Sequence, residues 1–157
     1  MDMQHTHRKA VIGELPAIIS LLKEDELGQG REQLENGLDK RYIDAFHRID
    51  VDPNQYLMVV LNTTLELVGT CHLTIMPSLT FMGSTRMQIE AVRVSEKHRG
   101  QKIEEWMMNQ AFDFAKSHGV LIIQLTTNKR RTKAKQFYER LGFKASHEGM
   151  KYYVKDA

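Results

Sequence analysis

Residues 89–114, IEAVRVSEKHRGQKIEEWMMNQAFDF, constrain the fold most, because they predict a strand, a short turn and a helix in direct succession. The first turn of a helix presents backbone N–H groups that have no partner inside the helix, so a strand leading straight into it can hold an anion there. The turn carries His98, Arg99 and Gly100. We therefore expect a site for a phosphate-bearing ligand at this turn.

The residues that follow indicate how this helix packs. Lys116 and Gly119 predict its C-terminal end. Residues 120–125, VLIIQL, are nearly all apolar and predict a central strand buried on both faces. Strand, helix and strand in this order imply a right-handed parallel crossover. One helix stripe should pack on the sheet: Ile103, Trp106, Met107, Ala111 and Phe114.

The first half of the chain predicts a strand, two helices and a meander. Residues 7–12 end in an apolar run and predict the first strand, and residues 14–24 and 39–50 have the apolar spacing of helices. The polar segment between these helices predicts a loop with a broken helical turn. Period-two alternation then predicts strands at 55–61, 66–76 and 85–94, joined by connections too short for parallel crossovers.

The C-terminal residues predict a helix at 133–141, followed by a hairpin of residues 143–147 and 150–154. The expected fold class is therefore α/β (α+β), with a mixed, mostly antiparallel central sheet and helices on both faces. Residues 1–157 are expected to form one domain.

Composition excludes several classes of protein. The net charge of +2 gives no general argument for nucleic-acid binding. The single cysteine excludes an intramolecular disulfide and favours a reducing compartment. The N-terminus has no apolar core of a signal peptide, and no apolar run has the length of a membrane span. We expect a cytoplasmic protein with no membrane and no nucleic-acid partner.

Three segments carry a family resemblance: IEAVRV followed by HRGQKIEEWMM, then IIQLTTN, and finally AKQFYERLGF. Together, in this order and spacing, they resemble the GCN5-related N-acetyltransferase (GNAT) superfamily. The order of predicted elements is similar along essentially the whole chain, and the FYERLGF segment is the most specific signal. The resemblance implies a transferase that uses acetyl-CoA as co-substrate, needs no metal, and acetylates a small-molecule, peptide or protein amine by direct transfer.

The resemblance also implies the site residues. Strand backbone at Val92 and Val94 would pair with the pantetheine arm. Backbone N–H groups of the turn would hold the pyrophosphate. Asn128 would contact the pantetheine or adenine end of CoA; the alternative, nearly as well supported, is that Asn128 is a simple turn residue. The turn residues are Arg99, Gly100, Gln101, Lys102, Ile103 and Glu104.

The turn departs from the family signature at two positions. Lys102 and Glu104 stand where the family has small residues. A carboxylate beside a pyrophosphate is repulsive, and a side chain there obstructs close approach of the backbone. An alternative function is therefore a CoA-binding or regulatory module of this fold with weak or no catalysis.

Two residues are candidates for proton transfer. Tyr138 matches the general acid of the family, and an ordinary phenol is protonated at neutral pH. A tyrosine at helical spacing is also typical of a core. Glu90 is the candidate base, acting directly or through a water; its apolar neighbours predict partial desolvation. The alternative for Glu90 is an ion pair with Arg86 or Arg93, or an exposed edge position.

Other polar features carry weaker hypotheses. Cys71 is interpreted as a packed core residue and not as a nucleophile, because adjacent His72 points to the opposite face of the strand. Residues 24–52 are rich in acids and suit a cationic amine or a solvated surface. Five cations in residues 129–135 suit the 3′-phosphate of CoA. Methionine and aromatic residues at 76–87 hint at a homodimer contact.

Overall fold

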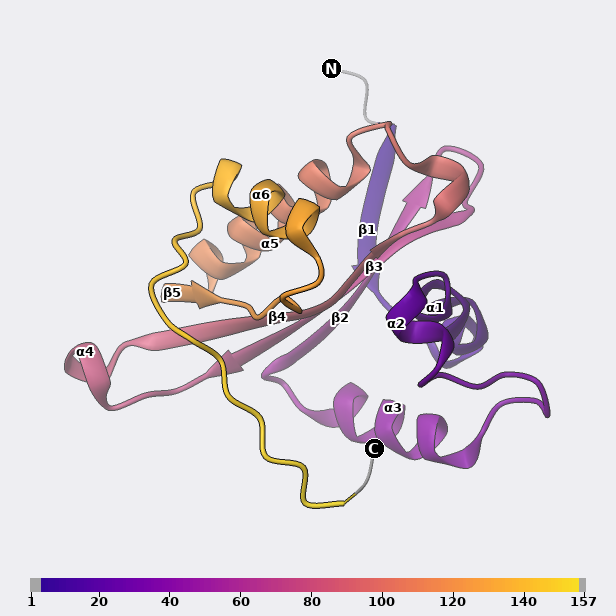
Figure 1. Cartoon of the computed structure of the whole chain (residues 1–157), viewed down its shortest axis with the longest axis horizontal. Helices are drawn as coiled ribbons and strands as arrows, with labels where there is room; N and C mark the ends of the chain where they lie inside the picture. Colours follow the sequence, from indigo (N-terminus) through magenta and orange to yellow (C-terminus); the bar gives the residue numbers. More distant parts are fainter. Residues whose placement is uncertain (1–3, 156–157) are drawn as a thin grey trace. The chain divides into compact units, whose positions relative to one another are not determined.

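The structure is a computed structural model that describes residues 4–155. The chain divides into two compact parts, Met1–Gln124 and Leu125–Ala157, which are described separately. The first contains the sheet and most helices, and the second contains one helix and an extended C-terminal segment (Figure 1). Within residues 4–155, no helix combines the length and apolarity that crossing a membrane requires.

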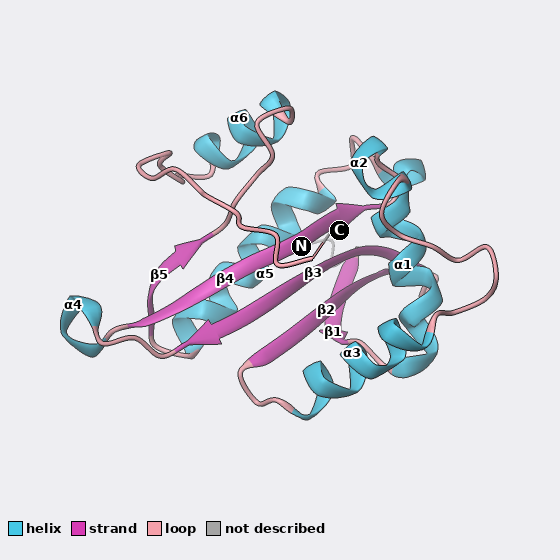
Figure 2. Cartoon of the chain, turned by 60° about the horizontal axis from the view of Figure 1, so that its bottom comes forward, coloured by secondary structure: helices cyan, strands magenta, loops and turns pink. Residues whose placement is uncertain are grey.

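Five strands form one sheet in the order β1-β2-β3-β4-β5 (Figure 2). They are β1 (His5–Lys9), β2 (Gln55–Asn62), β3 (Leu67–Met76), β4 (Thr85–Val94) and β5 (Val120–Gln124). The first four strands pair antiparallel, and β4 pairs with β5 in parallel. The predicted mixed, mostly antiparallel sheet is therefore confirmed. The first strand begins two residues before the predicted 7–12.

The longer helices of the first part also lie close to their predicted ranges, whereas the short helix at Thr80–Gly83 lies in a segment that was predicted only as a connection between strands. The helices are α1 (Leu15–Lys23), α2 (Glu26–Gln29), α3 (Lys40–Val51), α4 (Thr80–Gly83) and α5 (Ile103–Ser117), with 3-10 turns at Ile12–Glu14 and Glu96–His98. The short helix α2 is the broken helical turn expected between the first two helices. The sequence predicts a helix that begins near Gly100, but α5 begins at Ile103, because Gly100 and Lys102 have positive φ angles of 81° and 60°.

The two faces of β2 pack against different helices. Leu57 and Val59 are buried in a core with Ile18 of α1 and Phe46 of α3. Tyr56 points to the opposite face, where its ring centroid lies 4.7 Å from that of Phe114 on α5. Helices therefore cover both faces of the sheet, as predicted.

Strand β5 does not have the central position that its apolar sequence predicts. It lies at the end of the strand order, and Leu121 is 63% exposed. The hairpin predicted at 143–154 is absent, since the described residues of that segment contain no strand. A two-stranded hairpin is marginal without a face to pack on, and here Met150 and Tyr152 are exposed. With no hairpin paired beside it, β5 remains an edge strand among the described residues.

The second part contains α6 (Thr132–Arg140), close to the predicted 133–141. Tyr138 is buried on this helix, with its ring centroid 5.3 Å from Phe137 and 5.8 Å from Phe143. Gly142, at φ 104°, turns the chain so that the Phe143 amide donates to the Tyr138 carbonyl at 3.0 Å. All three rings of these two contacts thus come from the FYERLGF sequence itself.

Candidate functional site

Strand β4 contains a β-bulge in its second half. His72 of β3 pairs with Glu90, and Thr70 pairs with Arg93, so two residues of β4 lie opposite Cys71 alone. Ala91 has a φ of 52°, which places it in the left-handed region. A bulge bends a strand and increases its twist, and here it bends β4 just after the candidate base.

Beyond its first residues, β4 has an unpaired edge. Strand β5 pairs with β4 only from Thr85 to Gln88. In the described part of Met1–Gln124, residues 89–94 therefore have no strand partner on that side. An open edge of this kind accepts an extended ligand by backbone hydrogen bonding. Val92 and Val94, the predicted partners of the pantetheine arm, both lie on this stretch.

The edge leads directly into the turn that was predicted to hold an anion. Arg99, Gln101 and Lys102 are exposed, whereas Ile103 is only 2% exposed and anchors the helix in the core. The first backbone bond of α5 runs from the Trp106 amide to the Lys102 carbonyl at 3.1 Å. The backbone N–H groups that precede Trp106 in the helix are thus oriented toward whatever lies before the helix.

Glu104 gives this turn a distinctive electrostatic character. It lies in the first turn of α5 and is half-buried. Burial raises the pKa of the Glu104 carboxyl, while the nearby Arg93 and Arg99 guanidinium groups lower it. Burial therefore disfavours the charged form of Glu104, and the two neighbouring guanidinium groups partly offset this effect.

A network of polar contacts fastens the start of α2 to the end of β4. Arg93 forms an ion pair with Asp25 at 3.0 Å, and both side chains are mostly buried. Asp25 also caps α2 by accepting from the Gly28 amide at 2.6 Å. The Glu24 carboxylate accepts from the Glu96 amide at 3.0 Å. Sequence reasoning missed this link, because its partners are distant in the chain.

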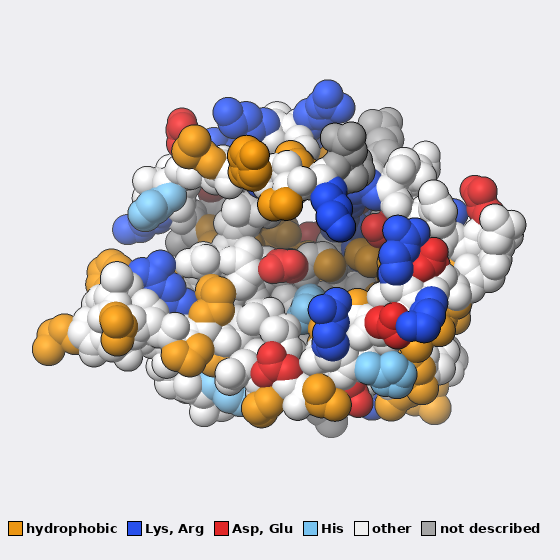
Figure 3. All heavy atoms as spheres, turned by 90° about the horizontal axis from the view of Figure 1, so that it is seen from below, with side chains coloured by type: hydrophobic (Ala, Val, Ile, Leu, Met, Phe, Trp, Pro, Cys, Tyr) orange, Lys and Arg blue, Asp and Glu red, His pale blue; other side chains and the backbone are white. Residues whose placement is uncertain are grey.

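Glu90 lies on a polar strip of the sheet face that α1 and α3 also occupy. Cross-strand pairing puts the members of this strip on one face, since His72 pairs with both Leu57 and Glu90. The strip consists of Gln55, His72, Thr74, Gln88, Glu90 and Gln124. Figure 3 looks onto this side of the molecule, where acidic (red) and histidine (pale blue) side chains reach the surface.

The expected desolvation of Glu90 is wrong. The prediction relied on the apolar neighbour Ile89, but Ile89 points to the opposite face of the strand and is buried there. The side chain of Glu90 is exposed. The two candidate ion-pair partners have other contacts: Arg86 donates to the Thr80 hydroxyl at 2.6 Å, and Arg93 forms an ion pair with Asp25 at 3.0 Å. Glu90 therefore stands open to a ligand on the polar strip.

His72 is a functional candidate that the sequence reasoning missed. Its Nε2 lies 2.6 Å from Oε1 of Gln55, which also accepts from the Thr74 hydroxyl at 2.9 Å. Burial lowers the pKa of His72, and the facing Glu90 carboxylate raises it, with burial the stronger effect. Period-two alternation alone places His72 on this face. The signal for its role would have been the register of β3 against β2 and β4.

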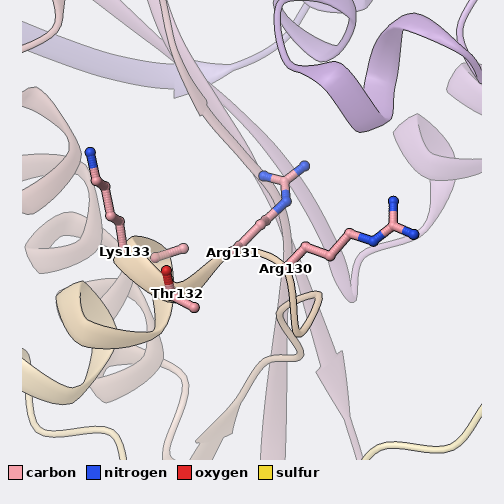
Figure 4. Close-up of a pocket in the computed structure, with 5 residues that line it drawn as sticks. Arg130, Arg131, Thr132 and Lys133 are labelled. Atoms are coloured by element: carbon pink, nitrogen blue, oxygen red, sulfur yellow. The ribbon is translucent and has the colours of Figure 1, made fainter.

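In the second part of the chain, polar and cationic groups gather at the start of α6. The Asn128 side chain accepts from the Arg130 amide at 2.9 Å, which gives it a local role in the loop. An open pocket of about 400 Å³ is lined by Arg130, Arg131, Thr132, Lys133 and Ala134. In Figure 4, the two arginines extend to one side of the loop and Lys133 extends to the other.

The chemistry of Cys71 agrees with its interpretation as a core residue. It is fully buried, with its Sγ 3.8 Å from Sδ of Met58. Burial raises the pKa of the Cys71 thiol to about 12, so the thiolate needed for nucleophilic attack is not formed near neutral pH. Among residues 4–155, no group of three or more His, Cys, Asp or Glu side chains is arranged to hold a metal ion.

Comparisons with known proteins identify relatives of the chain. Residues 16–143 match the model of the acetyltransferase (GNAT) family. The chain is 32% identical over 120 residues to an aminoalkylphosphonate N-acetyltransferase of Salmonella typhimurium, covering 74% of this chain and 75% of that protein.

Solved structures add two further likenesses. A structure described as a transcriptional regulator of Bacillus halodurans is 43% identical, with a TM-score of 0.91 over 96% of this chain and 99% of that chain. A predicted acetyltransferase of Clostridium acetobutylicum, solved with acetyl-CoA, is 18% identical; its TM-score is 0.72 over 96% of both chains. The last likeness shows the fold alone.

Proposed function

Since the chain belongs to the GNAT acetyltransferase family, we propose that it transfers an acetyl group from acetyl-CoA directly to an amine. The observation that carries this proposal is the unpaired edge of β4 leading into the turn before α5. A thioester donor with an extended arm and a pyrophosphate needs those two features in that order.

The donor would bind along this path. The pantetheine arm would pair with backbone at Val92 and Val94, and the pyrophosphate would accept from the N–H groups of residues 99–104. Gly100, at φ 81°, allows the chain to turn there. In the second part of the chain, the cationic pocket lined by Arg130, Arg131 and Lys133 suits a phosphate group such as the 3′-phosphate of CoA.

The chemistry requires one group that removes a proton from the acceptor ammonium and one that protonates the CoA thiolate. Tyr138 would supply the second proton as a phenol. The proton of the acceptor ammonium would be taken up on the polar strip, where Glu90 and its cross-strand neighbour His72 lie. Proton transfer by a placed group contributes about 10²–10⁴-fold to a rate.

The acceptor would be a primary amine that enters over the polar strip. The relative that acts on aminoalkylphosphonates motivates the first compounds to test. An aminoalkylphosphonate and the matching aminoalkane without the phosphonate form an informative pair. A preference for the phosphonate would indicate an anion-binding group beside the strip.

The test is acetyl-CoA binding by calorimetry, followed by an amine panel that monitors free thiol. We expect acetyl-CoA to bind and at least one primary amine to release CoA. Tyr138→Phe should then lower turnover while acetyl-CoA still binds. An absence of both binding heat and thermal stabilisation by acetyl-CoA would exclude the proposed function.

A second candidate is a CoA-binding or regulatory module with little catalysis. The observation that favours it is the pair Lys102 and Glu104 in the donor turn. Comparing CoA affinity of the wild type with that of a Lys102→Gly/Glu104→Gly double variant separates the two. A large gain in affinity with no wild-type turnover would favour the module, whereas wild-type turnover would exclude it.

A further inference from the structure

The polar strip contains a histidine whose proton position is fixed by its neighbours. Gln55 offers two distinct groups. Its amide Nε2 is directed at Oδ2 of Asp52 at 3.5 Å, and its carbonyl Oε1 lies 2.6 Å from Nε2 of His72. The Thr74 hydroxyl donates to the same Oε1 at 2.9 Å. All three contacts agree on the orientation of the Gln55 amide.

This orientation determines the tautomer of His72. A carbonyl oxygen only accepts hydrogen bonds, so the Nε2 of His72 must carry a proton and donate it to Gln55. In the neutral imidazole the other nitrogen, Nδ1, then holds a lone pair. Within residues 4–155, Nδ1 has no hydrogen-bond partner, and the half-buried ring leaves it available to a ligand.

From this hydrogen-bond arrangement, together with the pairing of His72 against Glu90, we propose that Nδ1 of His72 is the base that deprotonates the acceptor amine. The proposal rests on the proposed acetyltransferase function and names the group that takes the proton. Glu90 faces the ring across the β3–β4 pair and stabilises the imidazolium that forms. Glu90 is therefore a positioning residue, which affects the rate through its charge on His72 and does not itself take the proton.

The proton balance of the step is complete. The ammonium R–NH₃⁺ gives one proton to Nδ1, and the resulting amine attacks the thioester carbonyl carbon. The C–N bond forms, and the C–S bond breaks as the tetrahedral intermediate collapses. A second proton leaves the nitrogen and ends on the CoA sulfur through Tyr138. The imidazolium then releases its proton to solvent, so the net products are the amide, CoA and one proton.

The ionisable surroundings of the ring suit this role. Glu90 on β4 faces it directly, and Asp52 at the end of α3 acts through the Gln55 amide. On β3 itself the neighbours on the same face are Thr70 and Thr74. The pKa of His72 is lowered from 6.5 by burial, so the ring is neutral and ready to accept a proton at pH 7.

The first test is nitrogen NMR of the imidazoles in the ligand-free protein, which needs no substrate. We expect His72 to show a protonated Nε2 and an unprotonated Nδ1. A proton on Nδ1 in the neutral ring would overturn the proposal. The titration also gives the pKa of His72, against which the kinetic profile is then compared.

The second test is the pH dependence of kcat/KM for an acetylated amine. The wild type should lose activity on the acid side at the pKa that NMR gives for His72. His72→Gln retains an amide donor for Gln55, so it should fold; it should lower kcat about 10²–10⁴-fold and abolish that acid limb. His47→Gln, which changes an exposed residue of α3, is the matched control and should leave kcat and the acid limb of the profile unchanged.

Two further variants separate His72 from Glu90 as the base. Gln55→Glu places a carboxylate on Nε2–H, so the acid limb should move to higher pH. Glu90→Gln removes the charge that raises the His72 pKa, so the limb should move to lower pH and persist. Loss of the limb in Glu90→Gln, or its retention in an active His72→Gln, would overturn the proposal. A wild type that binds acetyl-CoA but acetylates no amine would instead remove the proposed function itself.

Discussion

Replacing Lys102 by glycine should stabilise the protein, although a substitution to glycine usually destabilises a folded protein. Lys102 is the residue before α5 and has φ 60° and ψ 22°, in the left-handed region. A side chain with a Cβ is strained there, and glycine is not. Lys102 is also exposed and places a cation at the N-terminal end of a helix, where the macrodipole disfavours it.

The magnitude follows from two opposing terms. Left-handed backbone costs an ordinary residue roughly 1–2 kcal/mol. Glycine loses more conformational freedom on folding, which costs roughly 0.5–1 kcal/mol. The net gain in the free energy of unfolding is therefore about 0.5–1 kcal/mol. For a chain of this size that corresponds to a rise in Tm of about 1–4 °C.

The assay is urea denaturation with thermal melting as a second probe, on three variants. Lys102→Ala removes the cation but keeps the strain, so it should gain less than Lys102→Gly. Lys97→Gly is the matched control, because Lys97 lies in the preceding 3-10 turn and is not among the residues with positive φ. It should lose stability. If Lys102→Gly lost as much as Lys97→Gly, the strain argument would be refuted.

Three other predictions concern groups that are fully or partly buried. Glu104→Gln should remove a pH dependence of stability. Because the pKa of Glu104 is raised in the folded protein, the wild type loses stability as pH rises from about 4.5 through that pKa. Thermal melts at several pH values should show this loss for the wild type and not for the variant. Cys71, buried and with a pKa of about 12, should react with iodoacetamide in the native protein far more slowly than after unfolding, as mass spectrometry can show. Thr70→Val should cost about 1–3 kcal/mol in urea denaturation, because it leaves the buried Met58 carbonyl without the hydroxyl that now donates to it at 2.7 Å.

The parts of the fold that the sequence predicted well are those with local signals. Strand β4 has the predicted bounds of Thr85–Val94, because a serine flanks each end and polar and apolar residues alternate regularly from Arg86 to Glu90. The helices were located by apolar spacing within one or two turns of chain. Strand β5 was misplaced because an apolar run of five or six residues indicates burial without indicating which neighbours provide it.

The candidate site was only partly predictable, since its key relations are long-range. Nothing in the local sequence marks Ala91 as a residue with positive φ, so the bulge was not expected. The pairing of His72 with Glu90 depends on the register between two strands, and the tautomer of His72 depends on Gln55, 17 residues earlier. A sequence pattern places each residue on a face, but it does not say which residues share that face across strands.

The bulge at Ala91 has a consequence for the parity of β4. In a regular strand, residues an odd number apart point to opposite sides, yet Glu90 and Arg93 both pair with residues on the face shared by α1 and α3. The inserted residue resets the odd–even count, so Arg93 reaches Asp25 on that face. Deleting one residue of the bulge would turn the Arg93 guanidinium to the opposite face of the sheet, where Met107 packs against Gly69. The strand therefore tolerates changes of residue type around Ala91 more readily than a change of length.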